Sequence, residues 1–370
     1  MRIRRKSEMR VKDMADMENR KTVVLADANE DFRNMLREVV EKTDRCRVSV
    51  VMSCYNEPLQ WIRLSIQSIL EQTFKDFEFI IICDDAENKA GIDYINEIGT
   101  RDSRVKLTIN PTNIGPTRCM NKAISLANGT YIARMDADDI ALAERFERQV
   151  SFLDSHKDIS VCATNAHAIN SKGRITRRNK YSHKLNPNYL FIFNSIAHPS
   201  VMFRRELLEV RKPLYNETYP YAQDYELWQH LVLKGYRIHT LPETLMLYRK
   251  SKTQISTNKK SHQDRIFRVV HRDFIFNWME AKGIIEKEDR HDLQLVLKKA
   301  GRAYKTLDRK DRDCLSKMIY VHYYSIGTKN KKYRLKYLVD SNFIIFQVRF
   351  ILTLRLLFSK KKRRSRQSID

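Results

Sequence analysis

Glycine and proline are scarce in this chain, with 9 and 8 copies among 370 residues. Such low numbers exclude collagen-like and linker-rich sequences, and they disfavour an all-β protein with many tight turns. Hydrophobic residues make up 42% of the chain, so most of it should fold around a buried core. The length suits one large α/β domain with an appendage, or two ordinary domains, built from long helices with short connections.

Paired cysteine motifs and long apolar runs are missing as well. The six cysteines are irregularly spaced without a Cys-x-x-Cys motif, and several lie in apolar runs typical of strands. We therefore expect reduced thiols in the core of a cytosolic protein. Residues 1–20 contain no apolar segment typical of a signal peptide, and no uncharged apolar run reaches the roughly 18 residues of a membrane-spanning helix.

Acidic residues are few near the C-terminus. Residues 251–370 hold 30 basic and 12 acidic side chains, which accounts for 18 of the net charge of +24. Such basicity suits a nucleic-acid-binding protein, or an enzyme whose tail rests on an anionic membrane. The basic segment has neither zinc-ligand spacing nor the aromatic signature of RNA-binding domains, and the middle of the chain is nearly neutral. Nucleic-acid binding is therefore the weaker alternative.

The middle of the chain alternates short apolar runs with helical patterns. Four runs read as strands, at residues 48–53, 77–83, 105–109 and 131–135. Strands this apolar, separated by helices, indicate a parallel sheet covered on both faces. Such sheets bind their ligands beyond the carboxyl ends of the strands. Residues that follow each strand are therefore the first candidates for a functional site.

Acidic side chains follow two of these strands. They are Asp84 and Asp85 after the second strand, and Asp136, Asp138 and Asp139 after the fourth. We expect these five carboxylates to converge on one crevice, where a divalent cation or basic side chains must compensate their charge. Aspartates separated by one residue can place a carboxylate on a hard cation that in turn binds phosphate. The alternative is that these acids only cap helices or face solvent.

Several motifs, in order, resemble a family 2 nucleotide-sugar glycosyltransferase with the inverting mechanism and the GT-A fold. The resemblance covers about residues 47–250 and is nearest to bacterial exopolysaccharide or capsule glycosyltransferases. It implies a Rossmann-like, mostly parallel sheet with helices on both faces. The motifs span residues 48–57, 65–73, 84–85, 113–124, 127–139, 197–204 and 223–228.

The resemblance implies roles for residues on the nucleotide side. Ser53 and Tyr55 match positions that lie against the nucleotide, with Glu57 beside them. Asp85, together with Asp84, matches the acid that hydrogen-bonds the base, and Arg118 matches a basic residue that faces the nucleotide and the diphosphate. From the residues alone, Tyr55 could instead belong to the core and Ser53 could be a buried strand residue.

The resemblance also implies a metal and a general base. Asp136 and Asp138, with Asp139 adjacent, resemble the metal-linked acids, where Mn²⁺ or Mg²⁺ would neutralise the departing diphosphate; Asp138 is the first choice as direct ligand. Asp224 matches the general base that takes the proton of the acceptor hydroxyl, so that one displacement inverts the anomeric carbon. Taken alone, Asp224 could be a helix N-terminal acid stabilised by the helix dipole.

Two further residues are left open. His198 could be a ligand or phosphate contact, or a hydrogen-bonded structural histidine, and Arg249 could reach the diphosphate or pair with a surface acid. The chain also departs from the family pattern twice. Residues 86–88 (Ala-Glu-Asn) replace the usual Gly-Ser, which puts the turn beside the base pocket in doubt, and the usual proline after Asp139 is absent.

The sequence predicts four regions. Residues 1–45 form a poorly ordered extension whose segment 22–42 resembles the first strand and helix of a response-regulator receiver, which is too little to hold a core. Residues 46–250 form the GT-A domain, and 251–340 a basic helical region. Residues 341–370 combine a mostly apolar helix with a polybasic tail that could lie on an anionic membrane or pack on the protein with the tail in solvent.

We therefore expect a metal-dependent hexosyl- or N-acetylhexosaminyl-transferase, acting on a lipid-linked glycan at the inner face of the cell membrane. The donor should be a nucleotide-diphosphate sugar, with UDP favoured. One alternative is a degenerate relative that binds nucleotide or glycan without turnover. A Rossmann dehydrogenase or P-loop enzyme is disfavoured, because neither Gly-x-Gly-x-x-Gly nor a Walker lysine motif occurs.

Overall fold

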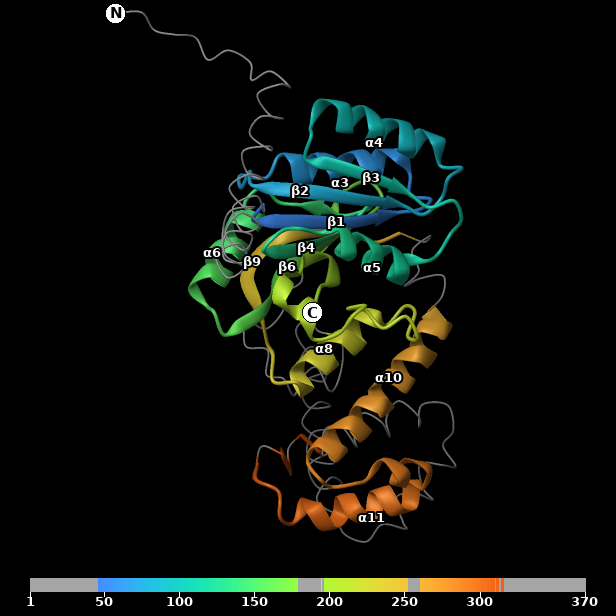
Figure 1. Ribbon diagram of the computed structural model, residues 1–370, viewed down its shortest axis with the longest axis vertical. Coiled ribbons are helices and arrows are strands. Elements are labelled where there is room, and N and C mark those ends of the chain that lie inside the picture. Colours follow the sequence, from blue (N-terminus) through green and yellow to red (C-terminus); the bar gives the residue numbers. More distant parts are fainter. Residues whose placement is uncertain are drawn as a thin grey trace, which may run out of the picture.

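The computed structural model describes residues 46–178, 194, 196–251, 260–309, 311–312 and 314–315 (Figure 1). The receiver-like segment and the tail at 341–370 lie outside these residues. So do residues 316–340 of the expected helical region. The rest of the chain forms a large sheet flanked by helices, followed by a smaller helical part.

Four parallel strands form one half of the sheet, in the order β3-β2-β1-β4. Their bounds match the apolar runs to within a residue: β1 is Val48–Cys54, β2 Phe77–Cys83, β3 Val105–Ile109 and β4 Tyr131–Asp136. All seven residues of β2 are buried, which explains why the strand has no polar face. The predicted α/β fold with a parallel sheet is confirmed.

The other half of the sheet is mixed. Strand β8 (Met202–Arg204) runs antiparallel to both β4 and β6 (Ile159–Ile169), and β6 pairs in parallel with β9 (Arg237–Arg249). Two short strands complete it, with β5 (Ile140–Ala141) on β9 and β7 (Ile175–Arg178) on β6. Long β9 therefore brings Arg249, far along the chain, beside the segment that follows β4.

Helices cover both faces, as predicted. Val50 of β1 packs in one core with Ile62 of α3, whereas Val51 packs in a second core with Met120 of α5. Alternate residues of a strand point to opposite faces, so one strand supplies both cores. Helices α3 (Leu59–Leu70), α4 (Lys89–Arg101) and α6 (Arg145–Ser155) serve the first core, and α5 (Pro116–Leu126) and α8 (Gln223–Leu233) the second.

The C-terminal helices form a smaller unit with its own core (Figure 1). Helix α10 (Lys260–Ala281) leads away from α8. Helix α11 (Leu293–Tyr304) packs against α10, with Val296 of α11 and Trp278 of α10 in the same core. Single 3-10 turns lie at His198–Ser200, Arg205–Glu209 and Lys287–His291. Among the described helices, none combines the length and apolarity needed to cross a membrane.

All six cysteines carry free thiols, as expected from their spacing. Five are buried and Cys46 is half-buried. Cys54 and Cys83 stand opposite each other at the ends of β1 and β2. The expected core position is therefore confirmed for five of the six cysteines.

Candidate active site

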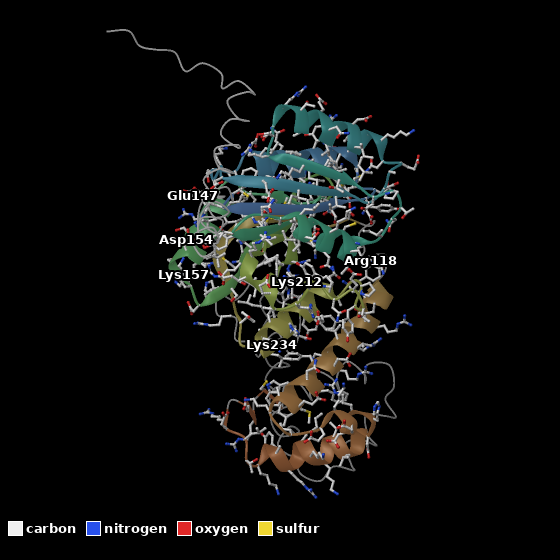
Figure 2. All side chains as sticks on the ribbon, viewed as in Figure 1. Arg118, Glu147, Asp154, Lys157, Lys212 and Lys234 are labelled. Carbon is white, nitrogen blue, oxygen red and sulfur yellow. The ribbon has the colours of Figure 1, made fainter. Side chains whose placement is uncertain are left out.

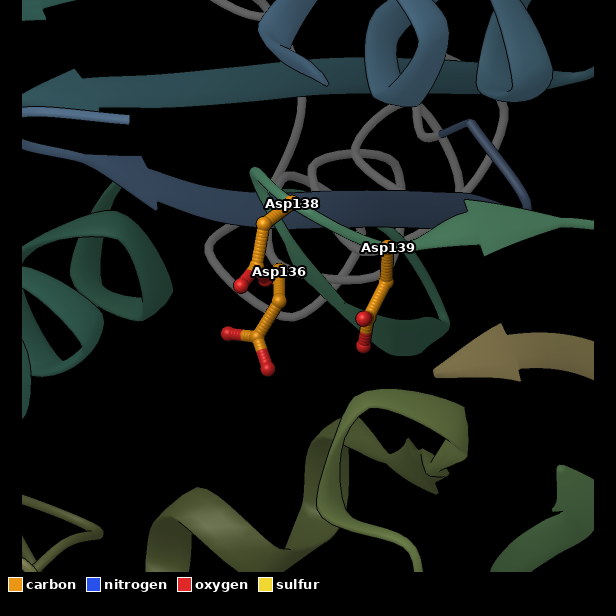
Figure 3. A group of neighbouring side chains, drawn as sticks. All are labelled: Asp136, Asp138 and Asp139. Atoms are coloured by element: carbon orange, nitrogen blue, oxygen red, sulfur yellow. The ribbon is translucent and has the colours of Figure 1, made fainter. Parts of the chain in front are cut away.

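Three carboxylates meet where β4 ends. Asp136 is the last residue of the strand, and Asp138 and Asp139 follow in the turn that leads into β5 (Figure 3). One oxygen from each side chain lies within 4.8 Å of the others. Asp136 and Asp138 are half-buried and Asp139 is fully buried. Of the five acids expected to converge, these three form one group; Asp84 and Asp85, which follow β2, do not belong to it.

Asp139 is held by one oxygen only. Its Oδ1 accepts a hydrogen bond from the backbone N–H of Arg249 at 2.7 Å, while its buried Oδ2 has no hydrogen-bond partner among the described residues. Burial, together with the negative charges of Asp138 and Asp136, raises the pKa of Asp139 well above its ordinary range. A buried carboxylate oxygen beside two further carboxylates is a donor set that suits Mn²⁺ or Mg²⁺.

Arg249 fastens the acidic turn to the sheet. Its Nε donates to the carbonyl of Asp138 at 2.7 Å, its Nη1 donates to the carbonyl of Asn170 at 3.0 Å, and its guanidinium lies 5.0 Å from the ring centre of Trp61. The residue is only 1% exposed. The structure shows its contacts with the acidic turn, and a contact with a diphosphate stays a prediction. Arg249 is a buried residue that shapes the acidic turn.

Arg134 is a charged residue beside the acidic cluster that the sequence analysis did not single out. It lies on β4 two positions before Asp136 and forms an ion pair with it, with 2.5 Å between Nη1 and Oδ2. Burial acts to lower the pKa of Arg134, but the charge of Asp136, its hydrogen bond to Arg134, and the charges of Tyr215 and Asp139 together more than offset this, and the pKa is raised. The sequence did contain an indication of this pair: Arg134 is the one charge inside an otherwise apolar strand, and it lies two residues before Asp136 and therefore on the same face.

Asp224 lies in the first turn of α8, as its helical pattern predicted. Its Oδ2 accepts a hydrogen bond from Asn194 Nδ2 at 2.6 Å. Burial raises the pKa of Asp224, and the hydrogen bond from Asn194 and the charge of Arg134 partly oppose the rise. The guanidinium of Arg134 is thus paired with Asp136, and its charge also acts on Asp224, so one cation influences both the acidic cluster and the candidate base.

His198 is half-buried and feels the charge of the same cation. Its Nε2 lies 2.8 Å from the hydroxyl of Tyr215, and its ring meets Trp228 edge-on with centroids 6.0 Å apart. Burial, aided by the charge of Arg134, lowers the pKa of His198 well below its ordinary range, so the imidazole is neutral. The hydrogen bond to Tyr215 is present, and a role for His198 as a ligand or phosphate contact stays a prediction.

The residues expected on the nucleotide side lie at the ends of β1 and β2. Tyr55 is 46% exposed and therefore not part of the core, and Ser53 is half-buried. Glu57 accepts a hydrogen bond from the backbone N–H of Tyr55 at 2.7 Å, and burial raises the pKa of its carboxyl. The Asn88 amide donates to the carbonyl of Tyr55 at 2.8 Å, which links the two strand ends.

The two acids after β2 have different surroundings. Asp84 is buried and accepts hydrogen bonds from the backbone N–H groups of Ile114 and Gly115, at 2.9 and 2.8 Å, so it holds the loop that starts α5. Asp85 is half-buried and accepts from the backbone N–H of Glu87 at 2.9 Å. Ala86 has no positive φ, so this turn forms without the glycine of the usual pattern.

Arg118 lies on the exposed side of α5 (Figure 2), with its side chain 63% accessible. Its Nε donates to Glu217 Oε2 at 3.0 Å, and Asn121 Nδ2 donates to the other oxygen of the same carboxylate at 3.1 Å. The guanidinium that the resemblance directs toward a diphosphate is therefore paired with an acid in this structure.

Comparisons with known proteins identify the family. The family profile described as Glycosyl transferase family 2 matches residues 49–211. An uncharacterised glycosyltransferase of Methanocaldococcus jannaschii, MJ1057, is 36% identical over 214 residues, which cover 57% of this chain and 73% of that protein. The chain belongs to glycosyl transferase family 2. It is a glycosyltransferase, and the acidic turn described above lies within the matched residues.

Two further relatives of the glycosyltransferase are informative. The Escherichia coli enzyme WfgD, named as a UDP-Glc:alpha-D-GlcNAc-diphosphoundecaprenol beta-1,3-glucosyltransferase, is 30% identical; the match covers 62% of this chain and 87% of that one. The crystal structure of S. aureus TarS 1–349 in complex with UDP-GlcNAc has a TM-score of 0.52 at 17% identity, covering 76% and 81% of the two chains. The second match confirms the GT-A fold.

Proposed function

We propose that this glycosyltransferase moves a sugar from a UDP-sugar to a hydroxyl of a lipid-linked surface glycan, with inversion at the anomeric carbon. The observation that supports it most is the acidic turn at the end of β4, where three carboxylates converge and the buried Oδ2 of Asp139 has no described partner. The names of relatives support the substrates, because WfgD is named for a UDP-Glc donor and a diphosphoundecaprenol-linked acceptor.

The acidic turn would hold a divalent cation, Mn²⁺ or Mg²⁺. Asp136, Asp138 and Asp139 are the residues of this chain that would bind it, with Asp138 as the first choice for a direct ligand. When bound, such an ion stabilises the negative charge that develops on a departing diphosphate. Arg249 supports these residues, since it ties the carbonyl of Asp138 to the sheet and its N–H orients Asp139.

Asp224 would act as the general base. Its pKa is raised by burial, which makes its carboxylate a better proton acceptor than an exposed aspartate. It would take the proton from the acceptor hydroxyl as that oxygen bonds to the anomeric carbon. The bond from that carbon to the diphosphate oxygen breaks in the same displacement, so the configuration inverts.

The ends of β1 and β2 would hold the nucleotide. The exposed ring of Tyr55 and the half-buried Ser53 and Asp85 lie at the same end of the sheet as the acidic turn, where parallel sheets bind ligands. Asp84 would act through the loop it holds rather than by touching the base, because its oxygens already accept two backbone N–H groups. Arg118 would have to leave Glu217 to reach a diphosphate.

The enzyme would act at an anionic membrane surface. The predicted tail lies outside the described residues, but the hairpin between β6 and β7 adds a second basic surface. Residues 170–178 contain no acid, and four exposed cations project from them: Lys172, Arg174, Arg177 and Arg178. The hairpin borders the acidic turn, because Arg249 binds the carbonyls of both Asn170 and Asp138. Phosphate groups of lipid would meet these cations beside the active site.

A thermal-shift panel tests the proposed donor and metal. UDP, GDP, CDP and ADP are each added with and without Mn²⁺ to the wild type, to Asp138→Ala and to a control, Asp158→Ala, which removes an exposed acid paired with Arg237. We expect UDP to stabilise the wild type and the control only when Mn²⁺ is present, and to leave Asp138→Ala unchanged. Metal-independent stabilisation, or none with any nucleotide, would contradict the proposal.

A further inference from the structure

We propose that helix α10, which lies beyond the family domain, positions the general base: Gln263 and Phe267 hold the segment that begins α8 and thereby set the place of Asp224. The proposal rests on the proposed role of Asp224. It assigns to the C-terminal helices a part in the transfer step, which neither the family match at residues 49–211 nor the sequence pattern assigns to them.

The segment before α8 has an unusual backbone. Tyr221 has φ = 69°, and it is the only described non-glycine residue with a positive φ. A bulky aromatic residue in this region is strained and persists only where surrounding contacts enforce it. Asp224 follows three residues later, so the strained turn directly determines where the carboxylate of the first helical turn points.

The contacts that enforce this turn come from α10. Gln263 Nε2 donates to the carbonyl of Tyr221 at 2.9 Å, and thus fixes the strained residue itself. The hydroxyl of Tyr219 donates to Asp273 Oδ2 at 2.9 Å, two residues before the turn. The ring of Tyr225 stacks on Phe267 with centroids 4.1 Å apart and planes within 5° of parallel, directly after Asp224.

These contacts hold the backbone both before and after Asp224, at Tyr221 and at Tyr225. Tyr225, Ala222 and Val270 form a buried apolar cluster, against which Phe267 packs. A stacked ring has little rotational freedom, so Tyr225 holds the peptide that joins it to Asp224. The other neighbour of Asp224 is Asn194, whose amide bonds the carboxylate itself. Gln263 and Phe267 are therefore positioning residues, which touch the segment that carries the base but not the reacting atoms.

The test compares Gln263→Leu, which removes the donor to Tyr221, and Phe267→Ala, which removes the stack, with two controls in the full-length protein. Phe267→Tyr keeps the stack, and Val296→Ala removes apolar volume from the core between α10 and α11, which meets α8 only at its last residue, Leu233. Turnover is followed as UDP release from UDP-glucose or UDP-GlcNAc with a synthetic GlcNAc-diphosphate lipid as acceptor. Hydrogen exchange of the peptide covering 219–227 reports the turn without any substrate.

We expect Gln263→Leu and Phe267→Ala to lower kcat at least 10-fold with the donor KM within twofold of wild type, because the nucleotide side is untouched. Exchange in 219–227 should rise in these variants only, and both controls should keep wild-type turnover and exchange. In an Asp224→Asn background, Phe267→Ala should cause no further loss, since there is no base left to misplace.

Three outcomes separate the possibilities. Unchanged exchange in 219–227 for both variants would overturn the positioning role whatever the substrate. Unchanged kcat in both variants, with Asp224→Asn inactive, would overturn it while the proposed function stands. Normal turnover of Asp224→Asn would instead remove the base assignment on which the proposal rests.

Discussion

Arg134 and Asp136 face each other on the same side of β4 and form a largely buried ion pair at the edge of the acidic cluster. Arg134 is only 9% exposed, and its charge also acts on Asp224 and Asp139. Without it, the acids around the end of β4 would be left with no buried cation on this strand. A charge that appears misplaced in an apolar strand is thus what allows the acids to gather.

Removal of this guanidinium should destabilise the protein. We expect Arg134→Met to lower the free energy of unfolding by about 3 kcal/mol, because the partner carboxylate stays behind as an uncompensated buried charge. Urea unfolding of the protein followed by tryptophan fluorescence measures the change. The double variant Arg134→Met/Asp136→Asn should regain part of the loss, since it leaves no unpaired charge. Equal stability of the single variant and the wild type would show that the pair contributes nothing.

Asp224→Asn should separate binding from chemistry. The amide keeps the shape and can still meet Asn194, so UDP binding in the presence of Mn²⁺ should stay within twofold by isothermal titration calorimetry. Transfer should fall by about 10²–10⁴-fold, the range for loss of a general base. The matched control is Glu226→Gln, which removes an acid in the same helical turn that pairs with Arg211 instead. Wild-type transfer by Asp224→Asn would rule out the base.

The pH dependence of kcat should follow the same carboxyl. A base must be ionised to accept a proton, and burial raises the pKa of Asp224, so kcat should fall on acidification with a midpoint above the ordinary aspartate value of about 3.9. Asn194→Ala removes a hydrogen bond that lowers this pKa, and should therefore move the acidic limb to higher pH. If the acidic midpoint of the kcat profile is the same in Asn194→Ala as in the wild type, a group other than Asp224 titrates.

Two glycine-to-alanine substitutions should change the free energy of unfolding in opposite directions. Gly115 begins α5 with φ = 87°, so Gly115→Ala places a side chain in the left-handed region and should cost about 1 kcal/mol of stability. Gly99 lies inside α4, where an added Cβ would meet only the carbonyl of Val105 at 3.7 Å. Gly99→Ala should therefore stabilise by about 0.5–1 kcal/mol. Urea unfolding measures both, and a stabilising Gly115→Ala would show that the loop held by Asp84 relaxes.

The basic hairpin should contribute to binding of anionic lipid. Replacing its four cations by glutamine should weaken binding to vesicles of phosphatidylglycerol and phosphatidylcholine at least 10-fold at about 0.1 M salt, because each basic group near such a surface contributes about 1 kcal/mol. Co-sedimentation measures the affinity. The control replaces four exposed lysines elsewhere on the protein, and equal losses in the two variants would show that net charge alone acts: Lys75, Lys89, Lys157 and Lys234.

The chain's own pattern was sufficient for much of the fold. The strands β1 to β4 are mostly apolar and separated by helical segments, which predicts a covered parallel sheet without reference to any contact. Asp136, Asp138 and Asp139 follow one another at the end of β4, so their meeting could be predicted from their order along the chain. The free thiols and the helical start at Asp224 were predictable for the same local reasons.

Contacts between distant segments were decided only by the tertiary structure. Asp139 and Arg249 are 110 residues apart, and Arg249 becomes a support of the acidic turn only because β9 pairs with β6 and ends there. The packing of α10 on the start of α8 likewise joins regions that the sequence separates at residue 250. Periodicity reports which face of an element is apolar, but not which partner covers it, because many partners satisfy the same hydrophobic pattern.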